Sequence, residues 1–352
     1  MNRLPAFVVL SLLSLIAVPR AIAQQGPPRP SPELRKLEPI VGHWRGEGTA
    51  LVDPMASPMK WTCVSANRWV LGGYWLESDI EISFEGMGSM RTREYLGWDQ
   101  ENGRFVKVSV SNTGEVSLST GGFKDDRTLF FFDPIRRGEA PFSVYVSRSI
   151  TRLRDDESSF EVAFLTRDGV IAKGVQGVLR RVDSAAPSPI ESAQAMAPES
   201  PEMARLVKMV GEYDVEGRMQ MMPGTEAVKV TGHDSLRSWF QGRILQFESR
   251  GTAEGMPGAY EAVGFYGWNA AERCYDFAMV SSMGEVGLMK ASFAEDGTFV
   301  STWNGTMMGT PVTSHSALRV GDDGKPTRLV SWSLLGSSKP YESFRAEYTT
   351  AK

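Results

Sequence analysis

Histidine and cysteine are the residues best able to bind metal ions, and in this sequence they are few and dispersed. The chain of 352 residues has three histidines, His43, His233 and His315, and contains neither a Cys-x-x-Cys nor a His-Glu-x-x-His motif. A zinc-type site needs several such ligands at fixed spacing, so we predict no metal site. Haem needs only one axial histidine, and a haem held by His315 therefore stays open as an alternative.

Nucleophilic catalysis has no local motif in this chain either. There is no Gly-x-Ser-x-Gly turn. The adjacent His233 and Asp234 would point to opposite faces of a strand, so they cannot form an orienting pair. Cys63 and Cys274 are either the two halves of a disulfide in an oxidising compartment or two buried free thiols, and we favour the free thiols. We predict no catalytic residue.

Methionine is abundant in the second half of the chain. Eleven of the 17 methionines lie between Met203 and Met308. In an extracytoplasmic protein thioethers bind Cu(I), but in alternating strands they pack the core or line a cavity, where they adapt to apolar ligands. The candidate ligand-lining residues are Trp75, Arg148, Met279, Met283, Trp303 and His315.

The overall composition excludes several classes of protein. Hydrophobic residues make up 41% and charged residues 23% of the chain, which is typical of a globular protein. The net charge is −4 and no long basic cluster occurs, so nucleic acid is not an expected partner. The length predicts about two domains.

The N-terminus has the layout of a secretory signal peptide. Arg3 precedes the apolar run Leu4–Val18, which leads to a small-x-small cleavage site at Ala21-Ile22-Ala23. The run of 15 residues is shorter than the roughly 18 that a membrane-spanning helix needs. We expect cleavage before Gln24 and a periplasmic or secreted mature chain without a membrane span. A retained signal anchor is the alternative.

The chain repeats itself at an offset of 169 to 170 residues. The matched pairs include Leu37 and Leu206, Gly42 and Gly211, Arg68 and Arg237, Gly97-Trp98-Asp99 and Gly267-Trp268-Asn269, and Gly114-Glu115-Val116 and Gly284-Glu285-Val286. A unit of this size can bury its own core, unlike a solenoid repeat. The register therefore indicates a tandem duplication of one domain.

The repeat defines the domain boundaries. We predict a signal peptide over 1–23, an N-terminal tail over 24–30, a first domain over 31–182 and a second domain over 203–352. Residues 183–202 are rich in Ala, Pro, Ser and Glu and lack aromatic residues, which is typical of a solvated linker.

Each copy has the pattern of successive short strands. Arg104–Val110 alternates apolar and polar residues, and the turn Asn112-Thr113-Gly114 leads into a second alternating run. We count about ten strands per copy, with a short helix predicted at Pro32–Ile40 and at Pro201–Val210. Antiparallel strands in this number avoid exposed edges by closing. The predicted fold class is all-β, with two tandem antiparallel barrels, each opened by a short helix.

The opening segments Leu37–Gly48 and Leu206–Tyr213 resemble the start of calycin-type barrels, in which a short helix leads into a Gly-x-Trp strand. The second copy, from Ser235 to Tyr348, resembles the bacterial family called domain of unknown function 1579 (DUF1579), and the first copy is similar mainly up to Asp126. The resemblance implies a calycin-like fold and implies no reaction.

Calycin barrels close one end with an arginine of the final strand over the aromatic residue of the opening motif. The resemblance implies that Arg180 or Arg181 covers Trp44 and that Arg345 covers Tyr213. The second copy departs from the Gly-x-Trp motif, because Tyr213 stands where the motif has tryptophan. The closure residues that the resemblance implies are Gly42, Trp44, Arg180, Arg181, Gly211, Tyr213 and Arg345.

The first copy is also distantly similar to the haem-binding nitrobindins, through the segment that ends at Gly46-Glu47-Gly48. That resemblance implies a haem ligand on a late strand. His315 stands there in the second copy, whereas Arg148 occupies the matching place in the first.

These patterns favour a small-molecule binding protein. We expect the barrels to hold an apolar or amphipathic molecule, because apolar pockets with a few polar groups are the usual ligand sites. One alternative is a cavity enzyme of the isomerase or hydratase type, which would need an inward carboxylate or tyrosine with a perturbed pKa. The others are a haem or gas-binding protein and a scaffold with filled interiors.

Overall fold

The computed structural model describes residues 29–51, 57–133, 146–165, 171–184, 186–190, 193–196, 200–256, 258–307 and 310–351. The predicted signal peptide and most of the predicted N-terminal tail lie outside these residues. The chain divides into two compact units, one built from Pro30–Pro198 and the other including Glu199–Lys352. Each unit contains one closed barrel of ten antiparallel strands.

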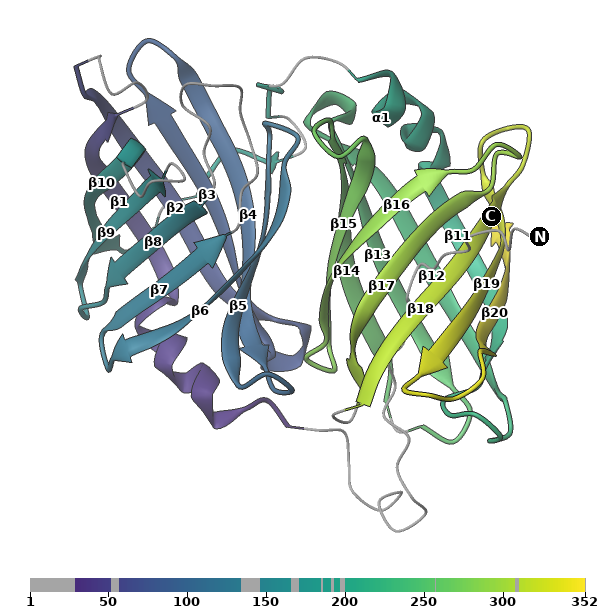
Figure 1. The fold of residues 1–352 in the computed structure, drawn as a ribbon. Coiled ribbons are helices and arrows are strands. Elements are labelled where there is room, and N and C mark those ends of the chain that lie inside the picture. The colour runs from purple at the N-terminus through teal and green to yellow at the C-terminus, as the bar shows by residue number, and fades with distance from the viewer. Residues whose placement is uncertain are drawn as a thin grey trace. The chain divides into compact units, whose positions relative to one another are not determined.

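Barrel 1 is a meander in which each strand pairs with its neighbour in sequence, and the first strand pairs with the last (Figure 1). Its strands are β1 (Gly42–Leu51), β2 (Met59–Val70), β3 (Trp75–Phe84), β4 (Gly88–Asp99), β5 (Arg104–Ser111), β6 (Val116–Asp125), β7 (Thr128–Asp133), β8 (Val146–Arg152), β9 (Glu157–Leu165) and β10 (Ile171–Val182). The 3₁₀ turn η2 (Leu71–Gly73) joins β2 to β3.

Barrel 2 has the same topology, with β11 paired to both β12 and β20 (Figure 1). Its strands are β11 (Gly211–Met219), β12 (Val228–Trp239), β13 (Ile244–Ala253), β14 (Tyr260–Asn269), β15 (Cys274–Ser281), β16 (Val286–Phe293), β17 (Phe299–Met307), β18 (Thr310–Val320), β19 (Pro326–Leu335) and β20 (Tyr341–Thr350). The 3₁₀ turn η5 (Phe240–Gly242) stands where η2 stands in barrel 1. The predicted all-β fold of two tandem ten-stranded barrels is confirmed.

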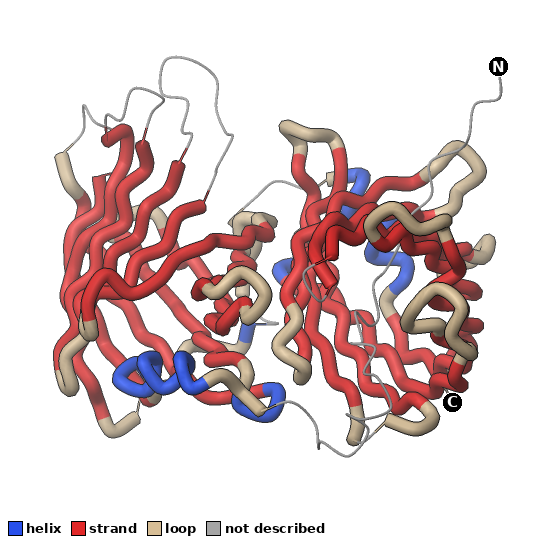
Figure 2. The backbone as a smooth tube through the Cα atoms, turned by 60° about the horizontal axis from the view of Figure 1, so that its bottom comes forward, coloured by secondary structure: helices blue, strands red, loops and turns tan. Residues whose placement is uncertain are grey.

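A short helical segment precedes each barrel, as predicted, but the two segments differ in type. The first is a 3₁₀ helix, η1 (Pro32–Ile40), which contains Pro39 and is capped by the Ser31 side chain. The second begins as an α-helix, α1 (Pro201–Leu206), and ends as a 3₁₀ turn, η4 (Val207–Met209). Figure 2 shows these segments at the ends of walls that are almost entirely strand.

The helical segments bury leucine and methionine side chains against one end of each barrel interior. Leu34 and Leu37 of η1 pack with Leu76, Leu96 and Phe105 in barrel 1. Met203, Leu206 and Met209 belong to the large core cluster of barrel 2. Among the described residues no helix is both long and apolar enough to cross a lipid bilayer.

Arg181, rather than Arg180, closes barrel 1. Its guanidinium lies 4.5 Å from the centre of the Trp44 ring and donates to the carbonyl oxygens of Val41 and Pro39, at 2.5 and 3.0 Å. A Cβ atom on Gly42, whose φ is +113°, would lie 2.7 Å from this guanidinium. The arginine closure that the resemblance implied is therefore present in the first copy, with a glycine required beside it.

Barrel 2 closes without an arginine, so the expected role of Arg345 is wrong. Arg345 points outward, is half-exposed and pairs with Glu342 three residues away. Tyr213 instead donates its hydroxyl to Met209 O at 2.8 Å and packs edge-on against Tyr348. A Cβ on Gly211 would lie 2.7 Å from that hydroxyl. Tyrosine can serve here because its own hydroxyl satisfies the end of the helical segment.

The described residues 188–190 and 193–196 of the predicted linker lie against barrel 1 instead of extending freely into solvent. Ser188 donates to the Glu81 carboxylate through both its backbone N–H and its hydroxyl. Arg91 donates to Ser188 O at 2.6 Å, and Asn112 donates to the carbonyl of Gln194. These contacts hold the segment to a side of barrel 1, a property that its composition does not reveal.

The closure geometry predicts unequal roles for two adjacent arginines. Replacing Arg181 by alanine removes a cation–π contact and three charged hydrogen bonds, to the carbonyl oxygens of Val41, Pro39 and Asp155. The free energy of unfolding of barrel 1 should therefore fall by about 1–3 kcal/mol. Arg180 points outward and makes only exposed ion pairs, so its alanine variant should lose less than about 0.5 kcal/mol. Urea unfolding of both variants tests this, and equal losses would contradict it.

Candidate functional site

Closure of the barrel decides which side chains face inward. Side chains alternate between the two faces of a strand, so the residues paired around the ring with a known core residue also face the core. In barrel 1, Trp61 on β2 belongs to the core, so its cross-strand partner Phe84 on β3 faces inward too. Two residues farther along each strand, Cys63 and Ile82 form the next inward pair. Around both barrels the strand pairs place each inward residue opposite another inward residue.

The interior of barrel 1 is open to water. Inward-facing Ile80, Ile82, Ser149, Val162 and Val175 are only half-buried. In barrel 2, by contrast, most inward positions of the strands are fully buried, including those of Tyr266, Phe277 and Met279. The two copies therefore differ in how completely side chains fill them.

One wall of the barrel 1 interior is apolar. It is centred on Trp61, which is 1% exposed, packs against Phe160 at 5.2 Å between ring centres and donates to Gln176 O. Room for this indole comes from glycines, because a Cβ on Gly48 or Gly177 would lie 2.5 or 2.1 Å from its ring. The rest of the wall consists of Met59, Ile80, Ile82, Phe84, Val175 and Leu179.

The other wall of barrel 1 carries an inward ion pair. Lys107 Nζ on β5 lies 2.9 Å from Glu94 Oε1 on β4, and the Ser109 hydroxyl donates to the same oxygen at 3.0 Å. Lys107 also lies 5.5 Å from the centre of the inward Phe131 ring. Both charged side chains are 18% exposed although they face the interior of a closed barrel. Water therefore reaches this wall, which reduces the cost of placing charge there.

The corresponding positions in barrel 2 carry no charge. The 170-residue offset places Gly264 where Glu94 stands and Phe277 where Lys107 stands. Phe277 stacks on Tyr266 with 4.0 Å between ring centres, and a Cβ on Gly264 would lie 2.5 Å from the Phe277 ring. Aromatic packing thus replaces the ion pair and fills the second interior.

Barrel 2 nevertheless contains one deeply buried carboxylate. Asp234 on β12 is 1% exposed and accepts a hydrogen bond from the Tyr348 hydroxyl at 3.0 Å. Burial raises the pKa of Asp234 to about 6, while the hydroxyls of Ser249 and Tyr348 and the charge of His233 partly oppose that shift. An inward carboxylate with a perturbed pKa is what the cavity-enzyme alternative required, and the groups in contact with this one are the hydroxyls of Tyr348 and Ser249.

Three of the predicted ligand-lining residues belong to the core of barrel 2. Met279 and Trp303 face inward, and Met283 packs against the same core from the turn after β15. The other three face away from the interiors. Trp75 lies over Gly97 on the outer face of β3, Arg148 pairs with Glu161 at 2.9 Å, and His315 lies on the outer face of β18 beside Thr302.

The outward direction of His315 removes the basis for a haem held inside barrel 2. His43 and His233 also face outward, each beside an inward neighbour, Trp44 and Asp234. His233 lies between Glu212 and Asp214, at 3.0 and 3.1 Å, and these contacts raise its pKa. Among the described residues there is no cluster of three or more potential metal ligands.

Both cysteines are free thiols, as predicted. Cys63 faces the apolar wall of barrel 1 and is 7% exposed. Burial raises its pKa to about 12, with the charge of Glu81 acting in the same direction and Arg91 opposing it. The thiol is therefore neutral at physiological pH and is not a nucleophile.

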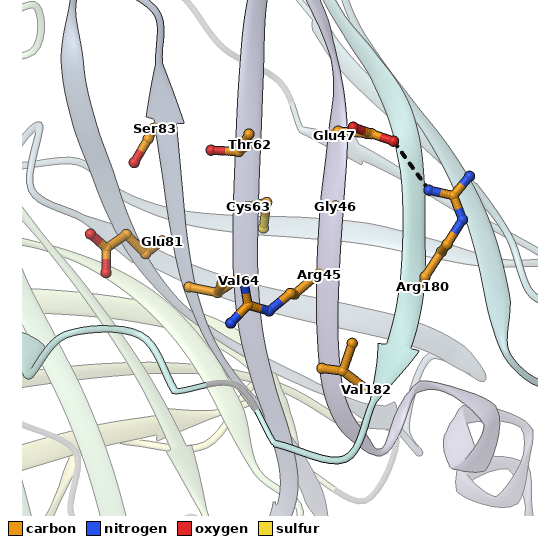
Figure 3. A pocket seen from close by; sticks show the side chains of 10 residues that line it. All are labelled: Arg45, Gly46, Glu47, Thr62, Cys63, Val64, Glu81, Ser83, Arg180 and Val182. Carbon is orange, nitrogen blue, oxygen red and sulfur yellow. Dashed lines mark hydrogen bonds and ion pairs between the residues drawn. The ribbon is translucent and has the colours of Figure 1, made fainter.

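A surface hollow of about 620 Å³ lies on the outer face of barrel 1, over β1, β2, β3 and β10 (Figure 3). Arg45 and Arg180 are cross-strand partners there, and Arg180 pairs with Glu47 at 3.1 Å. The Arg180 and Glu47 side chains are 57% and 71% exposed. Ion pairs this exposed contribute little, so the barrel 1 interior is the stronger candidate site.

Sequence reasoning missed Glu94, Lys107 and the Asp234–Tyr348 pair. Glu94 and Lys107 sit in strands that alternate apolar and polar residues, and the apolar valines of β5 turn out to face outward. Aligning the two copies could have identified Glu94 and Lys107, because the equivalent residues of the second copy, Gly264 and Phe277, are uncharged.

The fold and these interiors define a class of protein, a tandem pair of closed antiparallel barrels with chemically different interiors. The chain belongs to the family described as "Protein of unknown function (DUF1579)", whose model matches residues 29–181 and 199–291. The match to the first copy extends well beyond Asp126, farther than the sequence resemblance alone indicated. No curated protein matches the chain.

Similar solved structures include two bacterial proteins. Rv2717c from M. tuberculosis shares 20% identity, with a TM-score of 0.35, over 44% of this chain and 99% of its own. A DUF3598 family protein of unknown function from Nostoc punctiforme shares 8% identity, with a TM-score of 0.26, over 91% and 100% of the two chains. Kievitone hydratase from Nectria haematococca shares 10% identity, with a TM-score of 0.15, over 99% of each chain.

The buried Asp234 predicts a pH dependence of stability. Because its pKa in the folded state, about 6, exceeds the ordinary value of 3.8, the folded protein binds this proton more tightly than the unfolded chain. The resulting stability is fully present below about pH 4 and is lost as pH rises through about 6. The shift corresponds to about 3 kcal/mol.

Replacing Asp234 by asparagine should therefore change the free energy of unfolding by an amount that depends on pH. The free energy of unfolding of the variant minus that of the native protein should be about 2–3 kcal/mol larger at pH 7.5 than at pH 4. Asp322→Asn, in an exposed turn, is the matched control and should show no such difference. Urea unfolding at both pH values measures the effect, and a pH-independent difference for Asp234→Asn would contradict the assignment.

Proposed function

We propose that barrel 1 binds a small neutral amphipathic molecule in its interior. The observation that carries this proposal is the partial exposure of inward side chains in a closed barrel, with Glu94 and Lys107 each 18% exposed. A barrel interior that water reaches and that has one apolar wall is suited to a guest with an apolar body. The half-buried Ile80, Ile82 and Phe84 would contact that body.

The ion pair favours a neutral polar group on the guest. Lys107 has three N–H donors, and among the described residues its only hydrogen-bond acceptor is Glu94. A carbonyl or hydroxyl oxygen can accept one of the remaining hydrogens. An anionic group would approach the Glu94 carboxylate, 2.9 Å from the same nitrogen, and the repulsion would offset the attraction to Lys107.

We also propose that this binding takes place outside the cytoplasm. The support is the N-terminal pattern of a basic residue, an apolar run and a small-x-small site that ends at Ala23. Periplasmic and secreted locations agree equally well with this pattern.

Binding of prodan, a neutral naphthalene ketone whose fluorescence shifts to the blue in apolar surroundings, tests the ligand proposal. The full chain should bind prodan with a blue shift, and Lys107→Met should weaken binding about tenfold by removing the donor to the ketone. Arg148→Met, on the outer face of the same barrel, is the matched control and should bind like the native protein. Absence of binding, or equal binding by both variants, would refute the proposal.

A second arm tests the role of charge. Glu94→Gln removes the carboxylate but keeps the side-chain size, so Lys107 would then attract the anionic probe anilinonaphthalene sulfonate. We expect about a tenfold gain in affinity for this probe. Folding of each variant is checked by circular dichroism, and an unchanged affinity would show that the pair does not face the guest.

Export predicts a defined mature N-terminus. Expression of the full chain in a bacterium with a secretory pathway should yield a periplasmic or secreted product that begins at Gln24, as read by mass spectrometry of the intact protein. Replacing Ala21 and Ala23 by bulky residues should block the cleavage. A cytoplasmic product that retains Met1 would contradict the proposed location.

A further inference from the structure

The inward ion pair of barrel 1 uses only one of the two oxygens of its carboxylate. Lys107 Nζ and the Ser109 hydroxyl both donate to Glu94 Oε1, at 2.9 and 3.0 Å. Glu94 Oε2 makes no hydrogen bond with the described residues, and it is not among their buried unmatched atoms, so it is accessible to water. An accessible carboxylate oxygen on an inward side chain can accept a proton from a bound molecule.

The ammonium group of Lys107 is available to the same molecule. It carries three hydrogens, and among the described residues only Glu94 Oε1 accepts one of them. The nitrogen also lies 5.5 Å from the centre of the Phe131 ring. A fixed positive charge of this kind stabilises negative charge that develops on a nearby oxygen atom. The wall therefore presents a proton acceptor and an anion-stabilising group side by side.

The spacing of these two groups matches a ketone. The α-carbon of a ketone is two bonds from its carbonyl oxygen, and the two oxygens of a carboxylate are likewise two bonds apart. A ketone whose oxygen accepts a hydrogen bond from Lys107 can therefore bring an α-hydrogen to Glu94 Oε2. Ser109 is a positioning residue, because its hydrogen bond to Oε1 holds the carboxylate in one orientation. Holding the reacting atoms in place removes much of the entropic cost of the reaction.

The apolar wall of barrel 1 begins directly beside this carboxylate. Ile80 on β3 lies opposite Thr92, which precedes Glu94 by two residues and shares its face of β4. An apolar body on this wall displaces water from the ion pair, and the loss of water strengthens the electrostatic interactions there. In barrel 2 the equivalent positions hold Gly264 and Phe277, which can neither accept a proton nor stabilise an anion. Any chemistry of this ion pair therefore belongs to barrel 1.

We propose that barrel 1 catalyses the enolisation of neutral ketones with an apolar body, which rests on the proposed binding of such molecules in its interior. Glu94 Oε2 removes an α-hydrogen of the ketone as a proton. The electron pair of the broken C–H bond forms the carbon–carbon double bond of the enolate, and one pair of the C=O bond moves to the oxygen, where Lys107 stabilises the charge. Return of the proton from Glu94 to carbon completes the cycle, so no oxidant, reductant or co-reactant is needed.

Exchange of the α-hydrogens of prodan for deuterium tests this activity, because the propionyl ketone of prodan carries an α-methylene group. The full chain, in excess over prodan, is incubated in heavy water, and the recovered probe is analysed by mass spectrometry. Bound prodan should exchange at least about 100-fold faster than prodan in buffer. The first deuterium should enter faster than the second, because Glu94 reaches the methylene group from one side.

Two variants of the ion pair separate binding from proton transfer, with the blue-shifted fluorescence of prodan reporting the bound fraction in each sample. Glu94→Gln removes the base and keeps the donor Lys107. It should bind prodan at least as tightly as the native protein but exchange it about 100-fold more slowly. Lys107→Met should slow the exchange at least about tenfold at equal bound fraction. Circular dichroism checks that both variants are folded.

Two carboxylates outside this site provide matched controls. Glu161→Gln removes the partner of Arg148 on the outer face of barrel 1, and Asp234→Asn removes the buried carboxylate of barrel 2. Both variants should exchange prodan like the native protein. Bound prodan that does not exchange, or exchange that survives Glu94→Gln, would overturn the enolisation and leave the binding proposal intact. Absence of prodan binding would instead refute the binding proposal, and the enolisation with it.

Discussion

The pairing of the first strand of each barrel with the last is the constraint on which the rest of the structure depends. Once β1 pairs with β10, and β11 with β20, every strand has two partners and every side chain is assigned to one of two faces. A shift of one residue in register would exchange those faces. His233 and Asp234 show the consequence, because one is a surface histidine between two carboxylates and the other is the most buried acid of barrel 2.

The two copies have kept this frame and diverged inside it. At equivalent inward positions barrel 1 has Glu94, Lys107 and Ser65, whereas barrel 2 has Gly264, Phe277 and Asp234. Each exchange has a compensating partner. Loss of the Glu94 side chain makes room for the Phe277 ring, and the Asp234 carboxylate is accompanied by the Tyr348 hydroxyl. The barrel 1 interior is therefore open to water, whereas that of barrel 2 is filled more completely by side chains.

The strand pattern alone predicted most of the fold, because alternation and turn residues are local properties. The repeat register, the ten strands per copy and the helical segment before each barrel follow from it. The closure in the first copy followed from the resemblance, whereas Arg345 failed because the sequence cannot show that Tyr213 supplies its own hydrogen bond. The attachment of linker residues 188–190 and 193–196 to barrel 1 rests on Glu81, Arg91 and Asn112, which are far away in sequence.

The site was harder to predict, because alternation gives the period of a strand but not which face is inward. In β3 both Trp75 and Leu76 are buried, and only the register identifies Leu76 as the inward one. The same ambiguity placed Arg148 and His315 among the candidates although they face outward.

The central claim is that barrel 1 encloses accessible apolar space. Diffraction from crystals held under xenon tests it most directly, because xenon enters empty apolar cavities. The account predicts xenon inside barrel 1, in contact with the half-buried Ile80 and Ile82. A barrel 1 interior without xenon, in crystals that bind the gas elsewhere, would contradict it.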